Sequence, residues 1–226
     1  MCFSAGASFT ASAVLATAGT ATLREVRSKR EWLLAAFPVV LSVHQAIEGA
    51  LWLTIGRESL RTLQHWLAVT YLLIAYCVWP LVSPFALYLI EPDPRKKKRF
   101  VPLLVLGVVT SLYLLYYTIL GPVEASIVHH SLSYEAGIPH PDASTILYVV
   151  TVLLPFFFSS YPPILVLGGI TIVFCSVAYR MYQVTFDSVW CFFAAALSLN
   201  LYFFFRWLHR GQLQEVAQSG VNEHLQ

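Results

Sequence analysis

Charged residues are scarce in this chain of 226 residues, because Asp, Glu, Lys and Arg make up 12% of it. Soluble domains usually carry about 25% charged residues. Hydrophobic residues make up 58% of the chain, and the mean hydropathy is +0.67. The net charge is +2, with the basic residues in short connections, so no nucleic-acid partner is expected. The composition excludes an ordinary soluble domain and makes the lipid bilayer the first expected partner.

Two further absences concern the cysteines and the N-terminus. The four cysteines show no CxxC spacing, and three of them fall in apolar runs, as packing thiols do. The N-terminus has no basic region of a secretory signal, and no lipobox precedes Cys2. Residues 4–23 are therefore expected to form a retained first helix.

Long apolar runs dominate the rest of the chain. About 20 apolar residues are needed to cross the hydrocarbon core of a bilayer. Seven runs are expected to do so, and they cover residues 4–23, 32–55, 63–90, 100–120, 144–160, 162–183 and 188–208. The predicted fold is all-α: one bundle of seven transmembrane helices over residues 1–210, followed by a polar cytoplasmic tail at 211–226.

The orientation follows from Lys and Arg in the short connections. With seven spans, eleven basic residues fall on one side, after the first, third and seventh runs, and three fall on the other. The prediction is an N-terminus outside and a C-terminus inside, in the cell inner (plasma) membrane. The 121–143 connection, which has no Lys or Arg, would then lie outside.

Lysine is absent from every apolar run. The four lysines are Lys29, Lys96, Lys97 and Lys98, all in the connections predicted to lie inside. A retinal Schiff base needs a lysine within the bundle. A covalent retinal photoreceptor is therefore excluded, despite the helix count.

Polar residues share one face of the 32–55 helix. His44 and Glu48 are one turn apart, and Trp52 follows one turn later. Such groups are costly at membrane depth unless they face a protein interior or a wet cavity. We therefore expect a polar site around His44 and Glu48, with Gln45, Trp52, Trp79 and Trp190 lining a cavity.

The predicted topology brings other ligand-type residues to the same outer half: Cys2, His129, His130, Asp187 and Cys191. Zinc and other divalent transition metals take imidazole, thiolate and carboxylate ligands. Removal of Met1 would give Cys2 a free α-amine beside its thiol. The first hypothesis is therefore a metal site formed by Cys2, His44, Glu48, His129, His130 and Cys191. In a membrane-embedded metal-dependent hydrolase, Glu48 or Asp187 would then be the general base.

Two other interpretations remain open. In the first, the same cavity binds a lipid or small molecule without a metal, as in a transporter or sensor, and Glu48 binds a cation or takes up protons. In the second, His44 and Glu48 form hydrogen bonds that only stabilise the bundle. Neither the oligomeric state nor an enzymatic activity follows from these residues.

Several short motifs carry a resemblance to a known family. The opening Met1-Cys2-Phe3-Ser4-Ala5, the His44-Gln45 pair and Ser188-Val189-Trp190-Cys191-Phe192 resemble a family of uncharacterised bacterial integral membrane proteins over nearly the whole chain. That resemblance implies a membrane location and no activity. Helix count alone is similar to the seven-helix hydrolases that include alkaline ceramidases and adiponectin receptors. Asp187 and Cys191 stand where those enzymes carry HxxxH, and Ser42 is a nearby serine that can be matched to theirs, but not at the diagnostic spacing.

Overall fold

The computed structural model describes residues 4–128 and 130–210. The predicted ligands Cys2 and His129 and the predicted tail at 211–226 lie outside the described residues.

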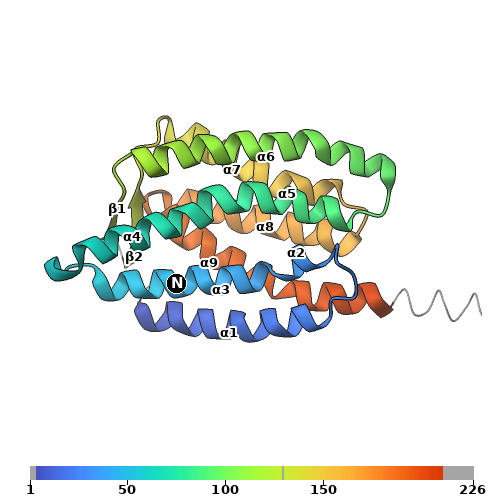
Figure 1. Cartoon of the computed structure of the whole chain (residues 1–226), viewed down its shortest axis with the longest axis horizontal. Coiled ribbons are helices and arrows are strands. Elements are labelled where there is room, and N and C mark those ends of the chain that lie inside the picture. The colour runs from blue at the N-terminus through green and yellow to red at the C-terminus, as the bar shows by residue number, and fades with distance from the viewer. Residues whose placement is uncertain (1–3, 129, 211–226) are drawn as a thin grey trace, which may run out of the picture.

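Helices account for most of the described chain, and they run along the long axis of the molecule (Figure 1). They are α1 (Ala5–Arg24), α2 (Trp32–Ala35), α3 (Phe37–Thr54), η1 (Glu58–Leu60), α4 (Arg61–Leu72), η2 (Leu73–Val78), α5 (Trp79–Ile90), α6 (Pro94–Leu120), α7 (Pro141–Leu153), η3 (Leu154–Phe158), α8 (Pro162–Met181), η4 (Gln183–Thr185) and α9 (Phe186–Ser198). Beyond α9 the chain is helical again from Asn200 to Arg210.

Six of these helical stretches are long and apolar enough to cross a membrane, counted within the described residues. They are Trp32–Thr54, Glu58–Ile90, Pro94–Leu120, Pro141–Phe158, Pro162–Met181 and Gln183–Arg210. A multi-pass, predominantly helical membrane protein is thus confirmed. The expected count of seven spans is not, and neither is the orientation of the termini.

The first helix makes the difference between six and seven. α1 has 20 residues, but Ala, Ser, Thr and Gly dominate it, so its apolar content is low. It lies alongside α3 (Figure 1), where small residues allow a close approach. A Cβ added at Gly19 would lie 2.6 Å from Val39 Cγ2. The Ser42 hydroxyl donates to the Ser12 carbonyl at 2.8 Å, so Ser42 serves this packing.

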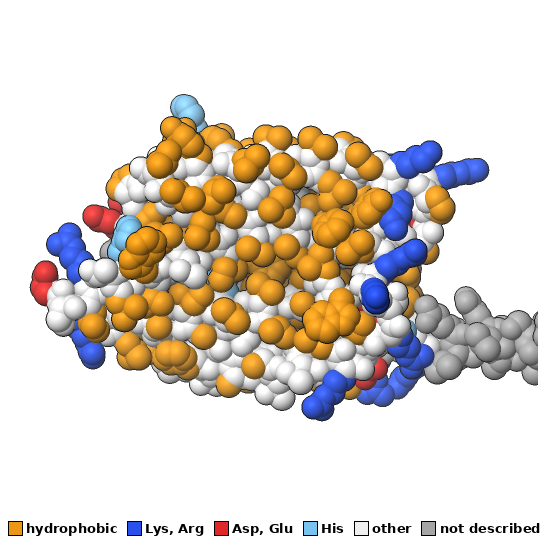
Figure 2. Space-filling view, viewed as in Figure 1, with side chains coloured by type: hydrophobic (Ala, Val, Ile, Leu, Met, Phe, Trp, Pro, Cys, Tyr) orange, Lys and Arg blue, Asp and Glu red, His pale blue; other side chains and the backbone are white. Residues whose placement is uncertain are grey.

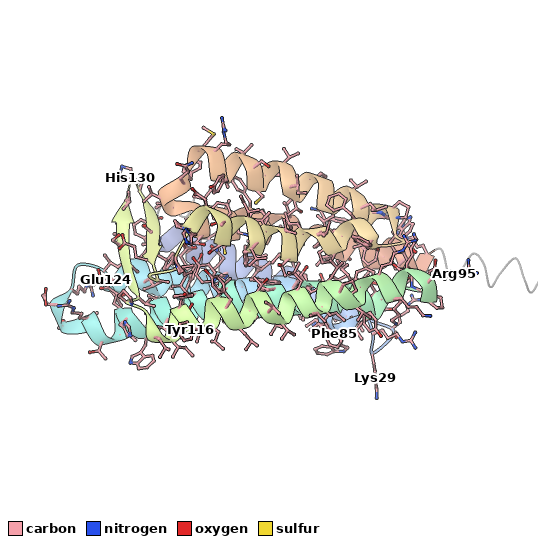
Figure 3. All side chains as sticks on the ribbon, turned by 90° about the horizontal axis from the view of Figure 1, so that it is seen from above. Lys29, Phe85, Arg95, Tyr116, Glu124 and His130 are labelled. Atoms are coloured by element: carbon pink, nitrogen blue, oxygen red, sulfur yellow. The ribbon has the colours of Figure 1, made fainter. Side chains whose placement is uncertain are left out.

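Charge marks the two ends of the bundle. Glu124 and His130 lie at one end, and Lys29 and Arg95 lie at the other (Figure 3). We call these the hairpin end and the basic end. Between the ends, hydrophobic side chains cover the visible face (Figure 2), and Leu112 and Val173 are each 60% exposed. Such a band suits contact with lipid.

The 63–90 run is not one regular helix. A π-helical turn, η2, separates α4 from α5. Pro80 follows it, and proline lacks the N–H that would continue the regular ladder. The Ser111 hydroxyl of α6 donates to the Cys77 carbonyl at 2.9 Å and so satisfies one of the carbonyls in this turn. Pro80 and the hydrogen bond from Ser111 thus account for the π-helical interruption between α4 and α5.

The expected connection at 121–143 contains a β-hairpin. β1 (Glu124–Val128) pairs with β2 (Ser131–Glu135) in antiparallel register, with Glu124 opposite Glu135. The all-α class is confirmed, and this short hairpin is a local addition to it. β2 packs against the start of α9 and covers one end of the bundle.

Candidate functional site

The polar stripe on α3 is fully buried. His44, Gln45 and Glu48 each have 0% of their surface exposed. α3 starts next to Pro38 and ends at Thr54, before Gly56 adopts a φ of 85°. Ionisable groups inside a membrane bundle are costly, and their presence in the interior is a default indication of function.

His44 is held in one tautomer by a backbone carbonyl. Its Nε2 lies 3.2 Å from the Tyr71 carbonyl oxygen, so Nε2 carries the proton and Nδ1 carries a lone pair. The imidazole also packs on the Tyr71 ring, with 3.9 Å between the centroids. Nδ1 has no hydrogen-bond partner among the described residues. The structure therefore presents a buried imidazole lone pair beside Glu48.

The first turn of α9 supplies the partners of Glu48. The Ser188 hydroxyl donates to Glu48 Oε1. The neighbouring Asp187 accepts from the Tyr76 hydroxyl at Oδ2, at 3.0 Å, and its backbone carbonyl accepts from the Tyr71 hydroxyl at 3.3 Å. Two consecutive residues of α9 thus join α3 to the helix that contains η2.

Tyr76 reaches Asp187 from within the π-helical turn. A π-turn adds a residue to the local repeat and so changes the direction of the side chains it carries. Such turns are frequent at functional sites. The π-helical turn next to Pro80 therefore directs Tyr76 toward Asp187.

A cavity of about 490 Å³ opens at the hairpin end, next to Asp187. Its volume lies in the range of small-molecule sites, roughly 300–1,000 Å³. β2, the segment after it, the starts of α7 and α9 and the end of α8 form its wall. The lining residues are Tyr76, Leu114, Tyr134, Glu135, Ala136, Gly137, Ile138, Pro141, Asp142, Ser144, Thr145, Tyr148, Tyr179, Gln183, Val184, Phe186 and Asp187. We call this the hairpin-end cavity.

Short series of contacts connect the hairpin-end cavity to the buried residues His44 and Glu48. Tyr134 lines the cavity and stacks on Tyr71, with 4.2 Å between the centroids and a 6° angle between the planes. Tyr71 in turn packs on His44. Asp187 lines the cavity, and the next residue, Ser188, donates to Glu48. An occupant of the cavity would touch Tyr134 and Asp187, whose neighbours Tyr71 and Ser188 contact His44 and Glu48.

Comparison with known proteins identifies a family. The chain matches the family of unknown function DUF6629 over residues 1–218. It belongs to this family. No curated protein and no solved structure matches the chain. The expected membership of an uncharacterised family is thereby confirmed, and membership in DUF6629 carries no activity to this site.

The structure spreads the other predicted site residues over several places. Trp79, Trp190 and Cys191 line a separate apolar cavity of about 70 Å³, with Tyr148 as the wall shared with the hairpin-end cavity. Trp52 is half-buried, and its indole N–H has no partner among the described residues. His130 is exposed next to β2, with a φ of 62°.

No group of three or more His, Cys, Asp or Glu residues that would hold a metal ion occurs within the described residues. His44 and Glu48 lie together on α3, while His130 lies at the exposed hairpin turn. Cys2 and His129 are outside the described part of the chain. The predicted metal site therefore stays a prediction.

Sequence analysis missed most of the cavity wall. The aromatic residues Tyr134, Tyr148, Tyr179 and Phe186 come from β2, α7, α8 and α9. A tyrosine in an apolar run has no signature that separates a cavity wall from ordinary core. The one available signal was the 121–143 connection, which carries Glu135 and Asp142 and has no Lys or Arg to neutralise them.

Proposed function

We propose that this protein binds a small molecule in the hairpin-end cavity, as a membrane transporter or sensor does. The observation that carries the proposal is the cavity of about 490 Å³ whose floor includes Asp187. Asp187 and Tyr134 connect it to the buried Glu48 and His44, which gives the costly intramembrane stripe a purpose. In this proposal the cavity lies on the outer side of the plasma membrane.

Ligand-dependent stabilisation of the purified chain tests this proposal. A ligand that binds the folded state at 100 times its Kd stabilises it by about 2.7 kcal/mol. We expect a thermal unfolding screen of small metabolites to show such a shift, and Asp187→Asn to reduce it. Glu58→Gln is the matched control, because Glu58 lies on η1 and is not among the residues that line the hairpin-end cavity. A shift of equal size in Asp187→Asn would contradict the proposed site.

Transport and sensing differ in their need for Glu48. Glu48→Gln removes the charge but keeps an oxygen that accepts from Ser188. For a proton-coupled transporter, we expect vesicles containing this variant to lose uptake while binding persists. For a sensor, uptake is absent in the parent protein as well.

A metal ion at His44 is the second candidate. The observation that favours it is the buried Nδ1 lone pair, with Nε2 fixed by a carbonyl, an arrangement that orients metal-binding histidines. Zinc takes three or four protein ligands, and the described residues supply His44 and Glu48. A hydrolase therefore lacks a complete ligand set in the described chain, and we assign no catalytic step to it.

Elemental analysis of the purified protein tests the metal. Stoichiometric zinc that is lost in His44→Ala would support this candidate. Metal-free protein that still binds a cavity ligand would reject it.

A further inference from the structure

The hairpin-end cavity has a one-sided charge. Within the described part of the chain, its lining includes the acidic residues Glu135, Asp142 and Asp187 and no Lys, Arg or His. Two of these groups, Glu135 and Asp142, are exposed. Positive potential nearby comes from the N-termini of α7 and α9, each worth roughly half a charge, and from Arg180, which is exposed and directly follows the lining residue Tyr179. The three carboxyl groups together outweigh these positive charges.

Aromatic rings form part of the wall, and four of them contact one another in two nearly perpendicular pairs. Tyr76 and Tyr148 have centroids 6.2 Å apart and planes at 69°. Tyr179 and Phe186 have centroids 5.7 Å apart and planes at 85°. Ring faces and edges at such angles are the elements of the aromatic cages that bind alkylammonium groups, because a ring face attracts a cation.

Size and ligand geometry distinguish an organic cation from a metal ion. A bound metal needs several donors that converge to within roughly 2.0–2.6 Å of one point. The carboxyl groups instead border a cavity of about 490 Å³, and two of them already accept from tyrosine: Asp142 from Tyr179 at 2.7 Å and Asp187 from Tyr76 at 3.0 Å. Those bonds orient the carboxylates along the wall and leave the volume for a bulky occupant.

We infer that the hairpin-end cavity binds a small organic ammonium ion, held by the carboxyl groups of Glu135, Asp142 and Asp187 against the tyrosine rings. The inference rests on the proposed function and names its ligand class. An ammonium group that is methylated or attached to a short alkyl chain loses little hydration on entry and gains the ring faces. An anion would meet carboxylates on every charged part of the wall.

A pair of isosteric probes separates charge from shape. Choline and 3,3-dimethylbutan-1-ol have the same shape, and only choline is charged. Titration calorimetry of the full chain in nanodiscs is expected to show choline binding roughly tenfold or more tighter than the alcohol, and weakening with added salt. The double variant Glu135→Gln, Asp142→Asn is expected to weaken choline binding roughly tenfold and to leave the alcohol unaffected.

Glu124→Gln is the matched control. Glu124 lies opposite Glu135, so the change removes the same charge from the same hairpin, and Glu124 does not line the cavity. Choline binding in this variant is expected to stay within about twofold of the parent, because Glu124 is exposed and makes no contact with the cavity, so water screens its charge. Equal binding of the two probes, or an unchanged affinity for choline in the double variant, would overturn the cation inference and leave the proposed cavity in place. Failure of both probes and of the wider ligand screen would overturn the cavity itself.

Discussion

Two acidic groups at opposite ends of the bundle have different surroundings. Glu91, at the end of α5 near the basic end, is 2% exposed and accepts from three donors: the Ser160 N–H at 2.8 Å, the Ser160 hydroxyl at 2.5 Å and the Asp93 N–H at 3.1 Å. Asp187, at the hairpin end, accepts from Tyr76 and borders a cavity of about 490 Å³. Glu91 links two connections of the chain by hydrogen bonds, whereas Asp187 presents its carboxyl group to a cavity.

The neighbours of Glu91 share its structural character. Glu31 accepts from the Arg27 N–H at 2.9 Å and lies 3.3 Å from His209 Nε2, which ties the end of the described chain to the connection after α1. The Tyr161 hydroxyl donates to the Ile90 carbonyl at 3.3 Å. Burial raises the pKa of the Tyr161 phenol, and the Glu91 and Glu31 carboxylates raise it further, so the phenol stays a neutral donor. The buried polar groups at the basic end thus link neighbouring segments of the chain and stabilise the fold.

The comparison predicts its largest effect for Glu91→Gln. An amide has one oxygen in place of two, so either the Ser160 N–H or the Asp93 N–H must face an NH2 group. A buried backbone donor without an acceptor costs about 1–3 kcal/mol, and the lost charge adds to it, so we expect about 3 kcal/mol of destabilisation. Thermal unfolding in detergent would show this as a Tm lower by about 6 °C or more. An unchanged Tm would show that the hydrogen bonds of Glu91 do not stabilise the fold. Glu58→Gln, on exposed η1, is the control.

A smaller effect is expected from Gly107→Ala, at the contact of α6 with the irregular α4–α5 helix. An added Cβ would fall on the Pro80 carbonyl oxygen, which is backbone and yields only if the helices separate. The expected loss of about 1–2 kcal/mol is accompanied by weaker ligand binding, because Pro80 follows the turn that directs Tyr76. Gly169→Ala is the matched control: a Cβ there meets nothing within 4 Å. Stability and binding that are equal in the two variants would disconnect the turn from the site.

The same contrast shows what the sequence reveals. The long apolar runs that form the helices follow from composition alone. The predicted polar site did not include Glu31, Glu91 and His209, which are all buried at the basic end. Their partners lie up to 178 positions away, as in the pairing of Glu31 with His209. No local pattern encodes such a pairing.

The hairpin end was harder to predict for a related reason. β1 and β2 are short. His130, which directly precedes β2, has a φ of 62° at a position where Gly or Asn would signal a turn. The cavity wall takes residues from six or more elements, so it exists only after tertiary packing. His44 and Glu48 were identifiable because their i, i+4 spacing is local and their burial in an apolar run is costly.

The smallest effect on stability is expected for Asp187→Asn. Asparagine keeps an oxygen that accepts from Tyr76, and the backbone carbonyl that accepts from Tyr71 is unchanged. Because a carboxyl group that borders a cavity serves binding more than folding, we expect the free energy of unfolding to stay within about 1 kcal/mol of the parent or to rise, as functional residues often cost stability. Choline binding, measured on the same preparation, is expected to fall. Glu91→Gln should show the opposite pattern, with a lower Tm and unchanged binding. If Asp187→Asn loses as much stability as Glu91→Gln, both carboxyl groups stabilise the fold, and the distinction between the two ends of the bundle disappears.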